Sequence, residues 1–112
     1  MAKYIFLQYV DESKSPRPGS PELNAVIDAF AKYLEEVQKA GAFLNGDACQ
    51  ASANGFSVSS GKTTDGPMHA QSPWLNGYFV LDCKDRAEAE MWAAKNPAAH
   101  GGTVEVHPIL TF

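Results

Sequence analysis

One segment, SPELNAVIDAFAKYLEEVQKAG at residues 20–41, constrains the fold more than any other part of the sequence. Its apolar residues recur at helical spacing and its charged residues fall on the opposite side, which predicts an amphipathic helix. Ser20 is a suitable N-cap, Pro21 suits the first helical position, and Gly41 follows the end of the pattern. Such a helix must lie against another layer of secondary structure to bury its apolar stripe. The residues of that stripe are Leu23, Val26, Ile27, Phe30, Leu34 and Val37.

Strand-like segments lie on both sides of this helix. In residues 3–10 (KYIFLQYV), both sets of alternating positions are mainly apolar, which predicts a strand covered on both faces. Residues 42–49 and 77–83 predict two further strands, and Gly46 in the first of them marks a bulge or a close backbone approach. Residues 103–110 predict the last strand, where Pro108 favours an edge or terminal position.

A second helix and a short hairpin complete the pattern. Asp85 and Glu88 form a capping pattern, Ala89 and Trp92 give the following helix a buried stripe, and the Asn-Pro pair at 96–97 ends it. Residues 56–64 predict a hairpin that turns on the Gly-Lys pair at 61–62.

The resulting order, β-α-β-hairpin-β-α-β, predicts a fold class. It is a ferredoxin-like α+β fold, in which an antiparallel sheet carries two helices on one face, within a single domain at residues 1–112. The other sheet face is then bare, although the strands are apolar on both sides. We therefore expect a homodimer that packs face to face.

Composition excludes several classes of function. The chain has 112 residues and a formal net charge of −4, which gives no basic field for nucleic acid. No apolar stretch approaches the roughly 20 residues that span a bilayer. The N-terminal residues MAKYIFLQYVDE lack the pattern of a signal peptide, so a cytoplasmic location with no membrane partner is expected.

The least regular stretch is TTDGPMHAQSPWLNGYF, residues 63–79. It predicts a loop longer than the usual connection of about 4–6 residues. The loop either lines a small-molecule site or covers a sheet edge or a subunit contact. Asp65 and His69 are four positions apart, so a folded loop could join them as a catalytic acid–base pair. The alternatives are that Asp65 is a turn residue and that His69 lies on the surface.

Further candidates concern ligand binding in the same region. Trp74 could stack on a planar ligand or plug a subunit interface, and Tyr9 could form another wall. Asp47 and Asn76 lie beside glycines at positions that the expected fold brings toward the same cavity. These side chains are candidate polar contacts for a ligand.

No motif for a metal or a cofactor is present in the sequence. The histidines have no zinc-ligand spacing, and neither a Gly-rich nucleotide loop nor a GxSxG motif occurs. No metal and no cofactor are therefore expected. Cys49 and Cys83 lack CxxC spacing, and we expect both to be buried free thiols.

Several of these segments together resemble a known family. The motifs are TDGP at 64–67, GYFVLD at 77–82 and AEAEMWAAKNPAAHGGTVEVHPI at 87–109. In this order they resemble the DGPF-type proteins of the YCII-related group. The resemblance implies a dimeric α/β barrel, and most members have no assigned reaction. Some members occur with, or fused to, extracytoplasmic-function sigma factors, which implies a regulatory or accessory setting.

The chain departs from that family at positions that bear on chemistry. The family usually continues DGP with Phe and an Ala-Glu-Thr-Lys-Glu run, where this chain has Met68, His69 and uncharged residues. In the wider group, a histidine on the first helix and an aspartate have been proposed as the active pair. The first helix here contains no histidine, and Asp11 is the residue that could match the aspartate.

Two functions from different classes follow. The first is a small-molecule-binding or accessory module, which the missing helix histidine favours. The second is a cofactor-independent enzyme that performs proton transfer, elimination or isomerisation on a small aromatic or carbonyl compound. In that enzyme Asp65 would be the base and His69 the acid or orienting partner.

Overall fold

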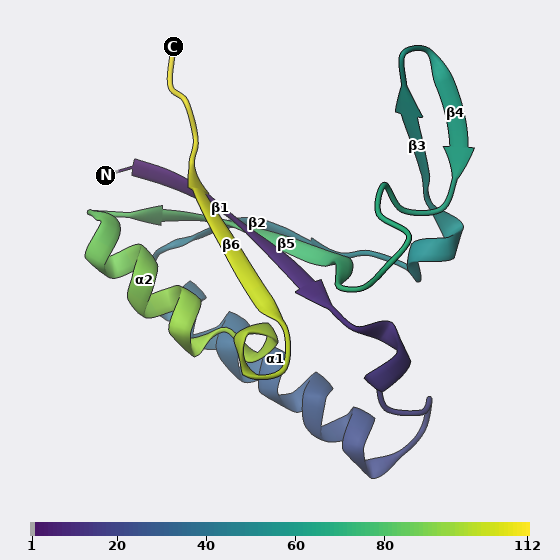
Figure 1. Cartoon of the computed structure of the whole chain (residues 1–112). Helices are drawn as coiled ribbons and strands as arrows, with labels where there is room; N and C mark the ends of the chain where they lie inside the picture. Colours follow the sequence, from purple (N-terminus) through teal and green to yellow (C-terminus); the bar gives the residue numbers. More distant parts are fainter. Residues whose placement is uncertain (1) are drawn as a thin grey trace.

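The computed structural model describes residues 2–112 and contains the predicted order of elements (Figure 1). The helices and strands are β1 (Ala2–Val10), η1 (Glu12–Lys14), α1 (Pro21–Lys39), β2 (Phe43–Ala48), η2 (Ser52–Asn54), β3 (Phe56–Ser59), β4 (Lys62–Asp65), β5 (Trp74–Cys83), α2 (Arg86–Lys95), η3 (Pro97–His100) and β6 (Thr103–Pro108).

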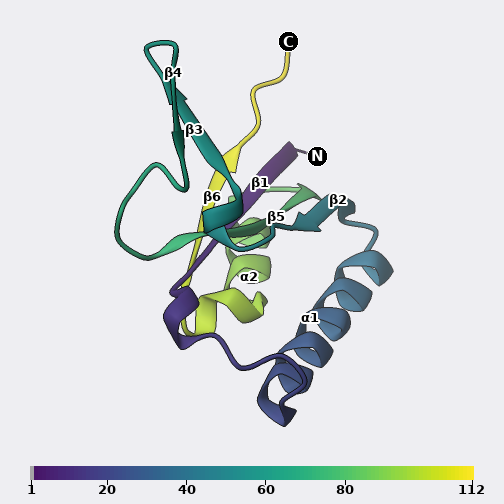
Figure 2. The ribbon, with the colours of Figure 1, turned by 90° about the vertical axis from the view of Figure 1, so that its right-hand side faces the viewer.

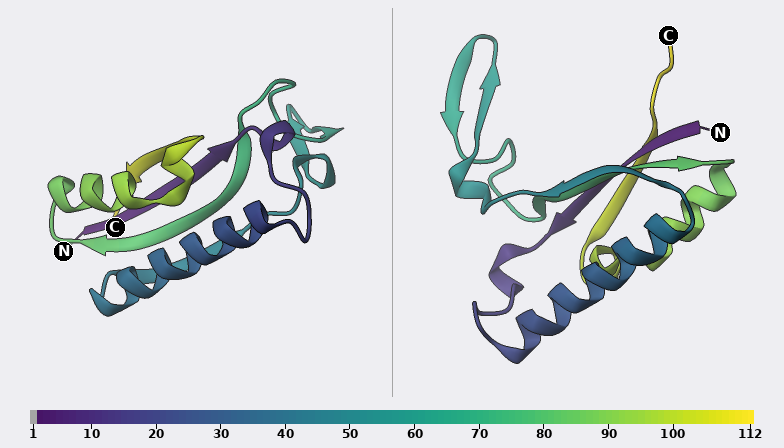
Figure 3. Two further views of the ribbon diagram at one scale, coloured as in Figure 1. Left: turned by 90° about the horizontal axis from the view of Figure 1, so that it is seen from below. Right: turned by 180° about the vertical axis from the view of Figure 1, so that it is seen from behind.

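Four strands form one antiparallel sheet in the order β2-β5-β1-β6. Helices α1 and α2 both lie on one face of this sheet (Figures 2 and 3). This arrangement confirms the predicted ferredoxin-like α+β fold. Strand β6 is an edge strand that ends at Pro108, where a missing N–H removes no ladder bond from a neighbour.

Both helices begin and end where their capping residues predict. The Ser20 hydroxyl accepts a hydrogen bond from the Leu23 N–H at 3.1 Å, and Gly41 follows α1 with φ +74°. At α2, the Asp85 carboxylate accepts from the Glu88 N–H at 2.9 Å. The Glu88 carboxylate reaches back to accept from the N–H of Lys84, the residue before the N-cap, at 2.7 Å, much as in a capping box.

The core lies between the helices and the central strands. Phe6 of β1 and Leu81 of β5 are fully buried, and Val37 of α1 packs with them. The Tyr33 ring meets the Trp92 ring edge to face, with 6.1 Å between centroids. The Tyr33 hydroxyl donates to the Trp92 carbonyl at 2.8 Å, which joins the two helices at this point.

The predicted stripe of α1 is buried over part of its length. Val37 is buried and Leu23, Phe30 and Leu34 are half-buried. In contrast, Val26 is 39% exposed and Ile27 is 55% exposed. The cause is the length of the helix, because its N-terminal turns run past the end of the sheet (Figure 1). The prediction that this whole stripe is covered was therefore wrong for Val26 and Ile27.

A buried polar pair ties β1 to the segment after α2. The Asn96 amide donates to the Gln8 side-chain carbonyl at 2.9 Å and accepts from the Ala98 N–H at 2.9 Å. Both side chains are almost completely buried, so these bonds satisfy groups that water cannot reach.

The β3–β4 hairpin stands apart from the sheet, on the side away from the helices (Figures 1 and 2). Its two-residue turn consists of Ser60 and Gly61, with φ of 52° and 76°, and not of Gly61 and Lys62 as predicted. Positive φ at both positions matches the twist of paired strands, as in a type I′ turn. Strand β5 begins at Trp74, so the irregular loop is confined to residues 66–73.

The sheet face opposite the helices, here called the outer face, has an apolar centre and polar edges. Ile5 pairs with Val80, and Leu7 pairs with Tyr78, at positions that alternate with the buried core residues. The flanking positions on β6 and β2 include His107, Glu105, Asn45 and Asp47. The expectation of a bare apolar face is met at the two central strands.

Close backbone approach in the sheet gives a prediction about stability. A Cβ at residue 77 would lie 2.8 Å from the Asp47 carbonyl oxygen and 3.0 Å from the Gln8 side-chain nitrogen. Gly77→Ala should therefore lower the free energy of unfolding by about 1–3 kcal/mol. Gly55→Ala is the matched control, because its Cβ would meet the Ser52 carbonyl at an ordinary 3.5 Å. Urea denaturation of both variants measures the difference, and equal stability of the two would contradict the prediction.

Candidate functional site

A cavity of about 620 Å³ lies between the base of the hairpin, the 66–73 loop and the adjoining ends of β1 and β5. It includes two ligand-binding candidates from the sequence, Tyr9 and Trp74, and one catalytic candidate, His69. The other residues that line it are Cys49, Gln50, Ala51, Ser52, Asn54, Gly55, Phe56, Ser57, Gly66, Pro67, Met68, Pro73 and Leu75.

A register shift shapes the end of the sheet at this cavity. Gln8 pairs with Gly77, but Tyr9 pairs with Leu75, so Asn76 is an extra residue on β5. A bulge of this kind bends a strand and changes the direction of the side chains that follow it. Tyr9 and Leu75 both line the cavity at the end of the outer face.

Trp74 has a second role beside lining the cavity. Its indole N–H donates to the His69 carbonyl at 2.9 Å, which ties the loop to the first residue of β5. The aromatic ring and the loop that carries His69 are therefore held together as one wall.

The Asp-Gly-Pro motif forms the junction between hairpin and loop. The Gly66 N–H donates to the Gly55 carbonyl at 2.7 Å, and Gly66 has φ +91°. Asp65 pairs with Phe56 across the hairpin, is exposed, and is not among the residues that line the cavity. Within residues 2–112, no hydrogen bond joins the Asp65 carboxylate to the His69 ring. The predicted acid–base pair is thus not assembled in this conformation.

The remaining predicted polar contacts lie outside the cavity lining. Asp11 caps η1, where it accepts from the Ser13 N–H at 3.0 Å and from the Ser13 hydroxyl at 2.6 Å. The hydroxyl bond lowers the pKa of the Asp11 carboxyl. On the sheet, the Asp47 carboxylate accepts from the Tyr78 hydroxyl at 3.0 Å, and this bond raises the pKa of Tyr78. Asn76 accepts from the Cys49 N–H through its main-chain carbonyl at 2.8 Å.

Sequence reasoning missed the contact that holds the far wall. The Glu12 carboxylate accepts from both the N–H and the hydroxyl of Ser52, each at 2.8 Å. These bonds fasten η2 to η1, which follows β1, and Ser52 lines the cavity. Glu12 and Ser52 are far apart in the sequence and share no motif, so no local pattern predicts the pair.

The two cysteines differ in environment. Both are free, and Cys83 is buried as predicted, but Cys49 is exposed at the cavity, so that part of the prediction was wrong. Cys49 follows the last residue of β2, where the chain leaves the sheet and no helix covers it. Burial raises the pKa of the Cys83 thiol to about 11, with a smaller contribution from the Glu88 carboxylate.

The residues that line this cavity carry no Asp, Glu, Lys or Arg side chain. Tyr9, Phe56 and Trp74 provide aromatic surface, and Gln50 and Asn54 provide neutral hydrogen-bonding groups. Such a cavity suits an uncharged, planar molecule, because a charged one would lose its hydration without gaining an ionic partner.

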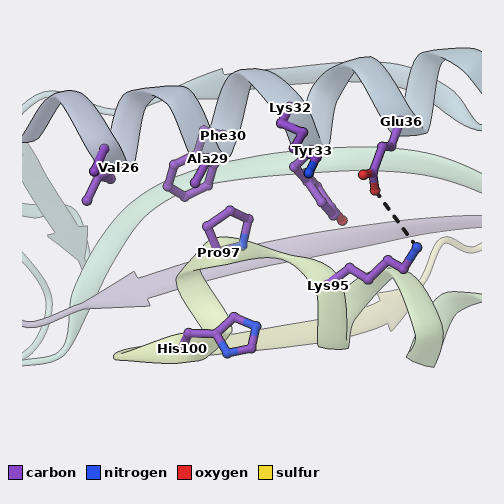
Figure 4. Close-up of a pocket in the computed structure, with 10 residues that line it drawn as sticks. Val26, Ala29, Phe30, Lys32, Tyr33, Glu36, Lys95, Pro97 and His100 are labelled. Carbon is purple, nitrogen blue, oxygen red and sulfur yellow. Dashed lines mark ion pairs between the residues drawn. The ribbon is translucent and has the colours of Figure 1, made fainter.

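A second cavity of about 610 Å³ lies between α1 and the α2–η3 segment (Figure 4). Val26, Ala29 and Phe30 form one side, with Pro97 opposite, and the Lys95–Glu36 ion pair spans one end at 3.8 Å. None of the site residues predicted from the sequence lines it. Over residues 2–112 there is no cluster of three or more metal-ligating side chains, and no helix there is long and apolar enough to cross a membrane.

The sequence profile of the YCII-related domain matches residues 2–112. The chain belongs to this family. Comparison of this YCII-related chain with curated proteins finds no match.

One solved structure similar to this YCII-related chain is 5-chloro-2-hydroxyhydroquinone dehydrochlorinase (TftG) from Burkholderia phenoliruptrix AC1100, in complex with 2,5-dihydroxybenzoquinone. The two share 14% sequence identity with a TM-score of 0.50, over 96% of this chain and 93% of that one. At this identity the similarity supports the fold of the YCII-related chain.

The environments of the two thiols predict their reactivity. In the folded protein at pH 8, iodoacetamide should modify Cys49 and leave Cys83 unmodified, because the Cys83 thiol is buried and its raised pKa keeps it protonated. Unfolding in urea should make both thiols reactive. Peptide mass spectrometry after timed quenching gives the two rates. Modification of Cys83 at the rate of Cys49 in the folded state would contradict the structure.

Proposed function

We propose that this YCII-related protein binds a small, uncharged, planar organic molecule in the cavity at the hairpin base and serves as a binding or accessory module. The observation that carries the proposal is the meeting of Tyr9, His69 and Trp74 around one cavity of about 620 Å³. Its volume falls within the roughly 300–1,000 Å³ of small-molecule sites.

The chemistry of the walls supports an aromatic or quinonoid ligand. Trp74 and Phe56 present ring faces or edges for stacking, and neutral amides and hydroxyls offer hydrogen bonds to carbonyl or phenol groups. The fold neighbour TftG was solved with a quinone, which makes quinones and hydroxybenzenes a sensible first set of probes.

A homodimer in the cytoplasm belongs to the same proposal. The apolar centre of the outer face, formed by Ile5, Leu7, Tyr78 and Val80, supports face-to-face packing of two copies. An isologous contact through this face would place both hairpin cavities at the ends of one interface.

The second candidate is a cofactor-independent enzyme, and the position of His69 in the cavity lining favours it. An imidazole can take or give a proton near neutral pH, which suits proton transfer on a carbonyl or phenolic compound. Asp65 would have to move toward His69 to act as its partner, since in this conformation it is exposed on the hairpin.

The proposal predicts which aromatic truncation abolishes binding. Trp74→Ala should remove stabilisation by a hydroxybenzoquinone probe, because it deletes the stacking surface and frees the loop that holds His69. Phe30→Ala is the matched control, since Phe30 lines the second cavity instead. Thermal shift is measured for each variant relative to its own ligand-free melting temperature. If the Phe30 variant alone loses the shift, the ligand binds in the second cavity, between α1 and the α2–η3 segment, and the proposal is wrong.

Asp65 separates the two candidate functions. Asp65→Asn should leave both the melting temperature and the probe-induced shift unchanged if the protein is a binding module, because Asp65 is exposed and lies outside the lining. Gly66→Val, in contrast, should lower the melting temperature, since φ of +91° strains a β-branched residue. If a reaction is found and Asp65→Asn abolishes it with the fold intact, the enzyme candidate is correct.

A further inference from the structure

We propose that the β3–β4 hairpin is an arm that packs against a second copy of this chain, and that this copy completes the wall of the hairpin cavity. The inference deepens the proposed function and rests on it only for the identity of the cavity as a ligand site. The arm itself is tested below without any ligand.

One face of the hairpin carries its two large apolar side chains, beside Thr63 and Asp65 of β4, and is exposed in the described chain. Phe56 and Val58 point to the same side of β3, and they are 69% and 58% exposed. Ser57 and Ser59 occupy the opposite face. An isolated two-stranded hairpin is only marginally stable in water, so an apolar face on such an arm calls for a contact.

The arm and the outer face lie on the same side of the molecule. The hairpin rises from the sheet on the side away from α1 and α2 (Figures 1 and 2). A second copy that packs on the outer face would therefore also contact the hairpin, which rises at one end of that face. The arm and the sheet together form an angular surface, which fits a folded domain better than a linear peptide.

The cavity is continuous with this surface. Tyr9 and Leu75 form a register pair at the end of the outer face, and both line the cavity. Leu75 is 41% exposed and Met68, on the loop, is 78% exposed. Both side chains line the cavity, and Leu75 joins it to the outer face, so a second copy seated on that face would cover this end of the cavity.

The size and charge of the surface favour a copy of the same chain. Four strands spaced by about 4.8 Å, each roughly 20–30 Å long, give a sheet footprint of roughly 400–600 Å². A standard interface buries about 800 Å² on each partner, and the arm supplies additional area. The central outer-face residues Ile5, Leu7, Tyr78 and Val80 are uncharged, so two chains of formal net charge −4 can meet there without direct repulsion.

The experiment uses Cys49 as a reporter, because it lines the cavity and is exposed in the single chain. Sedimentation velocity gives the dimer dissociation constant, and iodoacetamide gives the Cys49 modification rate across protein concentrations. In the unaltered protein the rate should fall as the dimer forms, by about the fraction of chains dimerised. A protein that stays monomeric at all concentrations, or a dimer with an unchanged Cys49 rate, overturns the proposal.

Matched variants on the arm locate the contact. Val58→Asp should raise the dissociation constant at least about tenfold and restore fast Cys49 modification, since it places a charge in the apolar contact. Ser59→Asp, on the opposite face of the same strand, should change neither quantity. Val58 and Ser59 both lie outside the cavity lining, so a direct effect on the ligand site is avoided.

A second pair of variants, on β4, controls for the possibility that an aspartate simply unfolds the hairpin. Thr63 pairs with Val58 and Thr64 pairs with Ser57, so they lie on the apolar and polar faces respectively. Thr63→Asp should reproduce the Val58 effect, and Thr64→Asp should not. If all four aspartate variants behave alike, the arm proposal is wrong. If no ligand probe binds, the proposed function is wrong, but the dissociation constants and Cys49 modification rates still test the arm proposal.

Discussion

A four-stranded sheet has two faces, and in this protein both helices cover the same one. Phe6, Leu81 and Cys83 are completely buried under α1 and α2, whereas Ile5, Leu7 and Tyr78 on the neighbouring positions are only half covered. The proposed site follows from this asymmetry. The hairpin, the 66–73 loop and the cavity that they line all lie on or beside the open side of the sheet, whereas the second cavity lies between the helices.

Much of the fold could be predicted because its determinants are local. The caps at Ser20 and Asp85 use side chains within three residues of the N–H groups they bind, and Gly41 marks the end of α1. The strands could be predicted from patterns of apolar residues, which are local in the same sense. The burial of the α1 stripe was overestimated, because a helical pattern says which side is apolar but not how far the sheet extends beneath it. The turn at Ser60 and Gly61 was misplaced by one residue, since Ser rarely takes positive φ and gives little signal.

The candidate site was harder to predict, because it is made by contacts between distant segments. Tyr9, His69 and Trp74 line the same cavity, and each lies at an end of a strand or in the loop. Asp11 and Asp47 instead accept hydrogen bonds from nearby groups of the chain. Asp11 caps η1 by accepting from the Ser13 N–H, and Asp47 accepts from the Tyr78 hydroxyl. A short polar side chain can serve such a bond or a ligand equally well, and sequence does not distinguish them. The Glu12–Ser52 contact depends on how η1 and η2 meet, which no periodicity encodes.

The walls of the cavity belong to the part of the molecule that is least attached to the core. None of the residues in β3 and β4 is buried, and the 66–73 loop is fixed to β5 by the Trp74–His69 bond, which is itself exposed. Segments with little buried apolar surface open at a lower free energy than the core does. A molecule that binds there must therefore order its own site, and part of the binding free energy offsets that cost. Since neutral hydrogen bonds and aromatic contacts provide the available attraction, selection should depend on shape and stacking rather than on charge. A site so loosely held also gains from any neighbour that fixes the hairpin in advance, because less ordering then remains for the ligand to accomplish.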